Sequence, residues 1–228
     1  MIDTPTTEGR KSPRVLMLYY SYSGQTRRLL DTAAAEFATR GYDVTNAQIG
    51  FTDARYARRF ARFPMRNVWP DMLSVLPAQV AGKTGDISIP REVSETPYDL
   101  VCIGSPTWWS KASMPIRSFL KTDEARNLLA GTPFATFVVC RDSWKGNLDE
   151  VRKLGQWQGG HYIGGMHVEY PGDQVRSMLS LTSFLGSGEY RESYRGVRLP
   201  PTNVQPEHLD EVRVFAAGLA DRLMGEKV

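Results

Sequence analysis

The sequence predicts an α/β fold in which helices cover both faces of a five-stranded parallel β-sheet. Two observations support this prediction. Short, continuous apolar runs, typical of strands buried on both faces, alternate along the chain with amphipathic segments of helical spacing. The chain also has 228 residues, of which 41% are hydrophobic and 23% charged, so it can bury one sizeable core. This composition excludes a collagen, a coiled coil and a wholly disordered chain.

Five apolar runs are predicted strands, and four amphipathic segments are predicted helices. The first strand, RVLMLYY at 14–20, is continuous and apolar after its first residue. The first helix, at 25–39, is followed by Gly41, a residue that favours helix C-terminal caps. A series of strands and helices in alternation gives parallel strands with helical crossovers. The other strands are predicted at 42–49, 99–104, 133–140 and 161–170, and the other helices at 114–121, 146–158 and 207–224.

Two long segments, residues 50–96 and 171–205, interrupt this alternation. Neither has the composition of a linker or an evident core of its own. Both are therefore predicted to be insertions on a single domain that spans residues 14–228. The polar segment at 1–13 is predicted to be a flexible N-terminal tail.

The chain is mildly basic, since 28 Lys and Arg residues against 25 Asp and Glu residues give a net charge of +3. This balance falls well short of that of a dedicated nucleic-acid-binding domain, so no nucleic-acid partner is expected. Two cysteines, Cys102 and Cys140, cannot form a disulfide framework and indicate a reducing compartment. Without an apolar signal-peptide core or an apolar run of ~18 residues, we expect a cytoplasmic protein with no membrane insertion. The three histidines lack metal-ligand spacing, so no metal site is expected.

The most informative segment joins the first predicted strand to the first predicted helix. It consists of Ser21, Tyr22, Ser23, Gly24, Gln25 and Thr26. A strand-to-helix turn with hydroxyl side chains and one glycine favours anion binding, because N–H groups at a helix N-terminus point outward and the helix dipole favours negative charge. The segment has no lysine, so the implied ligand is a phosphate monoester held by amides and hydroxyls. The alternative interpretation is a simple helix cap.

Residues 21–26, after the apolar run at 15–20, resemble the [ST]-x-[ST]-G-x-[ST] phosphate loop of the flavodoxin-like family. The resemblance extends over about 14–49, 97–170 and 206–224 and leaves out both insertions. It implies a flavodoxin-like three-layer sandwich that binds FMN at the carboxyl ends of the parallel strands. The short electron carriers of this family are usually acidic, whereas this chain has a mild positive net charge. In this respect the chain resembles the quinone-reductase and FMN-reductase branches more than the carriers.

The resemblance implies two further flavin-binding loops, one after the third strand and one after the fourth. The first resembles the family's G-[ST]-P-[TV]-aromatic pattern and is expected to contribute Ser105, Pro106, Thr107, Trp108, Trp109 and Ser110. One of its two tryptophans is expected to pack beneath the loop and the other to face the flavin, because a planar ring system needs an aromatic wall. The second loop is assigned by position alone and is expected to contribute Arg141, Asp142, Ser143 and Trp144. Cys140 and Cys102 are expected to be small buried residues rather than redox thiols.

The first insertion contains a basic segment, DARYARRFARFPMR at 53–66. Four of its arginines have the spacing of one face of a short helix that ends at Pro64, with aromatic residues on another face. They are Arg55, Arg58, Arg59 and Arg62. Three interpretations stay open: a solvated face, a site for an anionic substrate such as the phosphates of NADPH, and a contact with a membrane surface or nucleic acid. The apolar residues at 68–80 favour a cover over the flavin or an oligomer contact, and those at 178–185 favour burial between subunits, which leaves a homodimer open.

These features predict an FMN-dependent oxidoreductase that passes electrons from NAD(P)H to a quinone or another small-molecule acceptor. The cofactor would supply the chemistry, so no protein residue is assigned a catalytic proton transfer. Two alternatives stay open. The chain could be a flavodoxin-type electron carrier that serves a partner enzyme, or a flavodoxin-like binding module without flavin.

Overall fold

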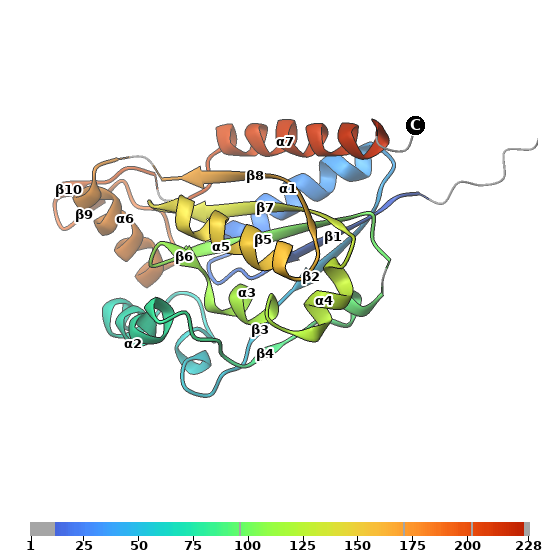
Figure 1. The fold of residues 1–228 in the computed structure, drawn as a ribbon. Coiled ribbons are helices and arrows are strands. Elements are labelled where there is room, and N and C mark those ends of the chain that lie inside the picture. The colour runs from blue at the N-terminus through green and yellow to red at the C-terminus, as the bar shows by residue number, and fades with distance from the viewer. Residues whose placement is uncertain (1–11, 96, 171, 202, 226–228) are drawn as a thin grey trace, which may run out of the picture.

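The computed structural model describes residues 12–95, 97–170, 172–201 and 203–225. At its centre lies a parallel sheet of five strands in the order β2-β1-β5-β7-β8, which confirms the predicted sheet (Figure 1). These strands are β1 (Arg14–Tyr19), β2 (Asp43–Gln48), β5 (Leu100–Trp108), β7 (Pro133–Cys140) and β8 (His161–Glu169). The predicted tail at 1–13 lies outside the described residues except for its last two.

Helices cover both faces of the sheet, as the sequence predicts (Figure 1). On one face, Met17 of β1 packs with Phe37 and Leu219 in one apolar cluster, and on the other face Leu18 packs with Phe119 and Val151 in a second. The first cluster is covered by α1 (Gln25–Thr39) and α7 (Pro206–Gly225), and the second by α3 (Met114–Phe119), α4 (Asp123–Leu129) and α5 (Trp144–Trp157). Successive side chains of β1 thus point to opposite faces of the sheet, and each face packs against its own helices, which gives three layers.

Two connections differ from the sequence prediction. The segment at 122–130 contains helix α4, whose N-cap residue Thr122 accepts a hydrogen bond from the N–H of Ala125. The third strand of the sheet does not end at Gly104, because β5 continues to Trp108 and pairs with a short antiparallel strand, β6 (Lys111–Ala112).

The first insertion contains β3 (Gly50–Phe51), the 3-10 turn η1 (Ala57–Arg59), α2 (Val68–Val80), β4 (Ile87–Ser88) and the 3-10 turn η2 (Arg91–Ser94). The predicted helix over 55–62 is wrong, because only the single turn η1 forms there. The Asp53 carboxylate accepts hydrogen bonds from the N–H groups of Arg55 and Asp86, at 2.9 and 3.1 Å. The carbonyl of Arg62 accepts another from the Tyr22 hydroxyl, at 2.5 Å. These bonds fix both ends of the segment on a path that a continuous helix does not follow.

The second insertion contains α6 (Gln174–Ser187) and a hairpin of β9 (Ser193–Tyr194) and β10 (Val197–Arg198). Figure 1 places α2, α6 and the hairpin at one end of the molecule, next to the carboxyl ends of the parallel strands. The two insertions touch there, since the Met65 N–H donates a hydrogen bond to the Leu185 carbonyl at 2.7 Å and α2 contacts α6.

Among the described residues, no helix combines the length and apolar character needed to cross a membrane.

Candidate cofactor and substrate site

The three loops that the sequence singles out meet at one cavity of about 240 Å³, at the carboxyl end of the sheet. Most of the predicted site residues line it. From the three loops these are Tyr22, Ser23, Gln25, Thr26, Pro106, Thr107, Trp108, Trp109, Ser110, Arg141, Asp142 and Ser143. The predicted residues Ser21, Gly24, Ser105 and Trp144 are not among the lining residues.

The first loop presents a helix N-terminus to the cavity. Gly24 is the N-cap of α1 in the left-handed conformation, with φ of 80°, and this residue makes no side-chain capping bond. The Ser21 hydroxyl accepts a hydrogen bond from the Arg27 N–H at 3.2 Å, and the Gln25 side chain accepts one from the Val204 N–H at 2.7 Å. Thr26 is buried at the cavity wall. The Ser21 hydroxyl thus occupies the Arg27 N–H, and the helix dipole and the N–H groups of Gln25 and Thr26 are available to an anion.

The second loop is a tight turn between β5 and β6. Trp109 and Ser110 have φ of 51° and 61°, a left-handed conformation that is uncommon outside glycine and that concentrates at functional sites. The Trp108 ring stacks on Phe60 at a centroid distance of 4.8 Å and meets the edge of Tyr20 at 5.7 Å. Both tryptophans are half-buried and line the cavity, but Trp108 also packs against these rings, whereas no ring contact of Trp109 is found among the described residues.

A buried polar network holds this turn from below. The Gln79 amide donates hydrogen bonds to the carbonyls of Trp108 at 2.9 Å and Ala112 at 2.7 Å. The fully buried Arg117 donates to the Gln79 side-chain oxygen at 3.0 Å and pairs with Glu150 at 2.6 Å. Glu150 also accepts the Ala112 N–H at 3.0 Å. Both ends of the Trp109–Ser110 turn are thus bound to one network that joins the first insertion to α3 and α5.

Sequence reasoning missed this network, although one signal was present. Arg117 stands within an otherwise apolar predicted helix, and an arginine in that position requires buried partners. It also missed Asn147 of α5, whose amide donates to the Ser105 carbonyl at 3.1 Å and the Thr107 hydroxyl at 3.0 Å. Asn147 explains how the buried Ser105 supports the second loop without lining the cavity.

The third loop is bound to the second insertion. Arg141 donates hydrogen bonds to Gln174 and Ser177 of α6, both at 2.8 Å. Gln174 donates in turn to the Asp142 carboxylate, and this bond, followed by one from the Ser143 N–H, holds the pKa of Asp142 below its ordinary value. Ser143 has φ of 62°, so both this loop and the second have left-handed non-glycine residues at the cavity.

Trp144 does not form a wall of the cavity. It is the first residue of α5, and its ring stacks on His167 of β8 at a centroid distance of 3.7 Å. Burial there lowers the pKa of His167. Sequence position alone placed Trp144 in the loop, whereas the helix begins two residues earlier than predicted and directs the ring toward the edge of the sheet.

The remaining wall of the cavity is apolar and comes from both insertions. The first insertion contributes Phe60, Met65, Met72 and Val75, and the second contributes Met178, Leu181 and Leu185. Val139, Cys140 and Tyr170 complete the wall. Burial raises the pKa of the Cys140 thiol to about 12 and also raises that of the Tyr170 phenol, so both groups stay protonated at neutral pH. These residues exclude water from one side of the three polar loops.

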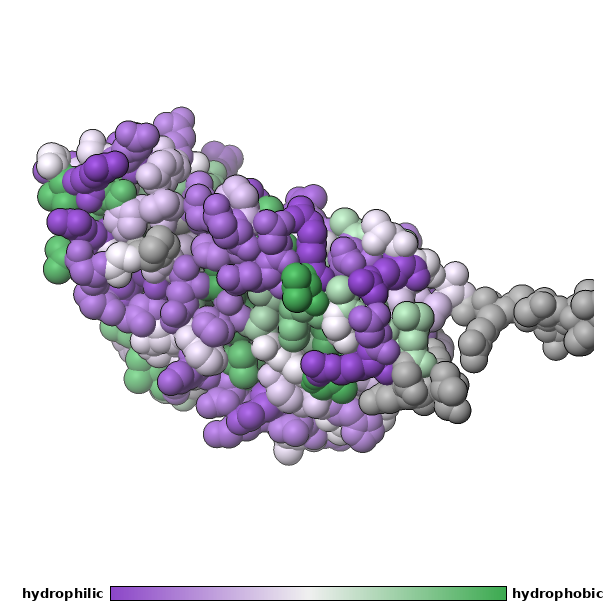
Figure 2. All heavy atoms as spheres, turned by 90° about the horizontal axis from the view of Figure 1, so that it is seen from above, coloured by the Kyte–Doolittle hydropathy of each residue, from purple (hydrophilic) through white to green (hydrophobic). Residues whose placement is uncertain are grey.

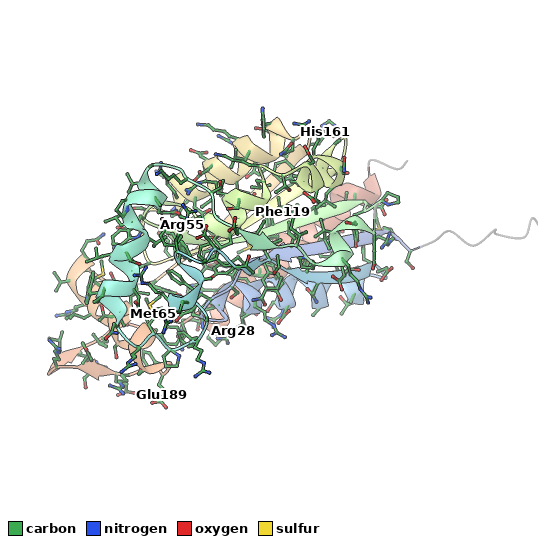
Figure 3. All side chains as sticks on the ribbon, turned by 90° about the horizontal axis from the view of Figure 1, so that it is seen from below. Arg28, Arg55, Met65, Phe119, His161 and Glu189 are labelled. Atoms are coloured by element: carbon green, nitrogen blue, oxygen red, sulfur yellow. The ribbon has the colours of Figure 1, made fainter. Side chains whose placement is uncertain are left out.

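None of the four predicted substrate-binding arginines lines this cavity. Arg55 pairs with Asp53 at 2.6 Å, and Arg59 lies 3.7 Å from Asp71. Figure 3 shows Arg55 and Met65 at separate places along the first insertion. The predicted helical stripe of arginines does not form, and the path of the chain directs Phe60 rather than these arginines to the cavity.

The sequence matches no family model and no curated protein. Several solved structures are nevertheless similar to the chain. A flavoprotein in complex with FMN from Lactobacillus acidophilus NCFM has a TM-score of 0.52 and 21% identity, and the alignment covers 68% of this chain and 93% of that chain. A flavodoxin from the domain Archaea has a TM-score of 0.51 and 12% identity, with 92% and 99% covered. Oxidised flavodoxin 2 from Bacillus cereus has a TM-score of 0.50 and 14% identity, with 92% and 99% covered.

The fold is flavodoxin-like. In such open α/β sheets, ligands bind outside the carboxyl ends of the strands, where the strand order reverses. Here the order reverses between β1 and β5, and the cavity lies beside the loops that follow these two strands. The flavodoxin-like core thus positions the loops, and the two insertions give the cavity its apolar cover.

Proposed function

We propose that this protein is an FMN-dependent oxidoreductase of the cytoplasm that passes electrons from NAD(P)H to a quinone or another small, planar acceptor. The observation that supports the proposal is the meeting of three polar loops and an apolar wall at one cavity. Flavoproteins are also the kind of protein that the chain resembles in fold. FMN, when bound, would supply the hydride and electron chemistry.

The residues of the cavity fit the two ends of FMN. The N-terminus of α1, with the hydroxyls of Ser23 and Thr26, suits a phosphate monoester. The Trp109 ring and the backbone groups of the second loop suit the planar ring system and its polar edge. The volume of about 240 Å³ is below the ~300 Å³ at which ligand pockets usually begin. Binding would therefore widen the cavity, and the flexible methionine side chains of its wall, Met65, Met72 and Met178, are suited to move.

The chain's own residues would bind and orient the reactants rather than transfer protons. The apolar wall suits a neutral planar acceptor and excludes water from it. The Cys140 thiol lines the cavity, but its raised pKa of about 12 leaves too little thiolate for thiol chemistry at neutral pH. Arg141 and Asp142 are bound to α6 and position that helix over the cavity.

The proposal is tested by adding FMN to the purified protein and recording its absorbance and its oxidation of NAD(P)H with and without a quinone. We expect bound FMN with the bands of an oxidised flavin, and NAD(P)H oxidation that depends on the quinone. Failure to bind added FMN would overturn the proposal. FMN binding with reduction only through a separate reductase protein would instead assign the chain to the electron carriers.

A further inference from the structure

Helix α2 has an outward face made of apolar side chains. Trp69, Leu73 and Val80 are 40, 48 and 56% exposed, and the prolines Pro70 and Pro77 are exposed beside them. Their spacing of three, four and seven residues places them along one side of the helix. The opposite side holds Val75, which lines the cavity. Amphipathic helices of globular proteins usually turn their apolar side inward, so an outward apolar face indicates a contact.

This face continues onto the second insertion. A groove of about 510 Å³ lies between Trp69 of α2, the apolar side chains Val175 and Leu179 of α6, and Tyr194 of the β9–β10 hairpin. Val175 is 69% exposed. Hydrophobic side chains are visible at this end of the molecule in Figure 2. We call the α2 face and this groove together the apolar end.

The two chain segments that contain or adjoin the elements of the apolar end carry a net positive charge, and Arg195 lines the groove itself. Residues 53–71 and 173–198 contain nine arginines and five carboxylates, a net charge of +4, whereas the other nineteen basic and twenty acidic residues leave the rest of the chain at −1. Six of these arginines have no ion pair within the described residues. They are Arg58, Arg62, Arg66, Arg191, Arg195 and Arg198.

We propose that the apolar end docks onto the surface of an anionic lipid bilayer. An exposed apolar helix face with a tryptophan, flanked by unpaired arginines, combines the two interactions that hold peripheral proteins at a membrane. The apolar side chains would enter the region between headgroups and acyl chains, and the arginines would bind lipid phosphates. A second copy of the chain fits less well, because its arginines would face the same arginines across the contact.

Docking would place the cavity close to the lipid. Met178 lines both the groove and the cavity, so the apolar end and the cavity share a wall side chain. An apolar molecule dissolved in the membrane could therefore enter without crossing water. This consequence rests on the proposed function, whereas the docking itself does not.

The test measures co-sedimentation of the full chain with phosphatidylcholine vesicles that contain or lack phosphatidylglycerol. We expect binding to the anionic vesicles that weakens as salt rises. Leu73→Glu should weaken it at least about ten-fold, and Arg62→Glu or Arg66→Glu at least about five-fold each. The matched controls Val214→Glu on α7 and Lys121→Glu after α3, both at exposed positions away from the apolar end, should bind as the unchanged protein does.

Equal binding to both kinds of vesicle, no binding, or no effect of Leu73→Glu would overturn the proposal. A dimer in light scattering that Leu73→Glu dissociates, without vesicle binding, would assign the apolar end to a second copy and also overturn it. Circular dichroism of each variant checks that it is folded. FMN uptake is recorded separately on the same samples, so a failure of docking and a failure of flavin binding are told apart.

Discussion

Gly24 shows how a single backbone conformation prepares the first loop. Its φ of 80° turns the chain into α1, and no atom lies within 4 Å of where a Cβ would stand. Any effect of a small side chain there is therefore a backbone effect rather than a clash. Gly41, at the other end of α1, has φ of 82° and the same open surroundings, and it lies away from the cavity.

The two glycines give a matched pair of variants. Gly24→Ala and Gly41→Ala should each lower the free energy of unfolding by about 1–2 kcal/mol, because alanine is strained in the left-handed conformation. Only Gly24→Ala should also weaken FMN binding, by about ten-fold or more, since it disturbs the N–H groups at the start of α1. Denaturant unfolding and a fluorescence titration with FMN measure the two effects. Equal FMN affinities in the two variants would contradict this role for Gly24.

Asp53 controls the path of the first insertion through its charge. The Arg55 side chain, and then the N–H groups of Arg55 and Asp86, lower the pKa of this buried carboxyl to about 2. A carboxyl with a lowered pKa in the folded state stabilises the protein above its unfolded pKa of ~3.9. That stabilisation is lost as the pH falls from about 4 toward 2.

Asp53→Asn should therefore melt at a lower temperature than the unchanged protein at pH 7, and the difference should shrink below pH ~4. The effect is modest because the Arg55 side chain is largely exposed. Asp210→Asn is the control, since this exposed carboxylate pairs with Arg213 on the surface of α7. Thermal melts over a series of pH values provide the measurement. A difference that stays constant down to pH 2 would show that the charge of Asp53 is not responsible.

At the scale of elements, the second loop depends on an insertion far from it in sequence. Gln79 of α2 binds the carbonyls on both sides of the Trp109–Ser110 turn, and Arg117 and Glu150 hold Gln79 and Ala112 in place. Gly146 of α5 allows the same turn to approach closely, because an added Cβ would collide with the Ser110 carbonyl. The strained turn is thus fixed from two sides.

Gln79→Leu should weaken FMN binding about ten-fold or more, because the turn that carries Trp109 loses both side-chain bonds. It should also lower the free energy of unfolding by about 1–3 kcal/mol, since buried polar partners lose their bonds. Gln158→Leu is the matched control: Gln158 is equally buried and binds the carbonyls of Leu120 and Thr122, away from the cavity. The control should lose stability but keep its FMN affinity. Similar losses of affinity in both variants would refute a specific role for Gln79.

The elements differ in how well local sequence predicts them. The strands and α1 are predictable because a continuous apolar run or a helical period determines them locally. The path of 53–66 is not, because Asp86 and Tyr22, distant in sequence, decide it. The same distinction applies to the site. The loops at 21–26 and 105–110 are predictable because short local motifs identify them. The role of Gln79 is not, because it depends on contacts with residues distant in sequence.

At the scale of the whole molecule, the insertions change what a flavodoxin-like core can do. They cover the carboxyl end of the sheet with methionine, leucine and phenylalanine side chains, and among the described residues they also hold most of the arginines that form no ion pair. Under the proposed function, an electron acceptor would pass these apolar residues to reach the cavity. This arrangement suits a small apolar acceptor better than direct docking of a partner protein on the flavin.

The central claim is that the cavity binds FMN with its phosphate at the start of α1. The most direct test is a fluorescence titration of the purified chain with FMN and, in parallel, with riboflavin, which lacks only the phosphate. The account predicts that FMN binds at least about 100-fold more tightly, because the uncapped N–H groups and hydroxyls of the first loop act on the phosphate alone. Equal affinities for FMN and riboflavin, or binding of neither, would contradict it.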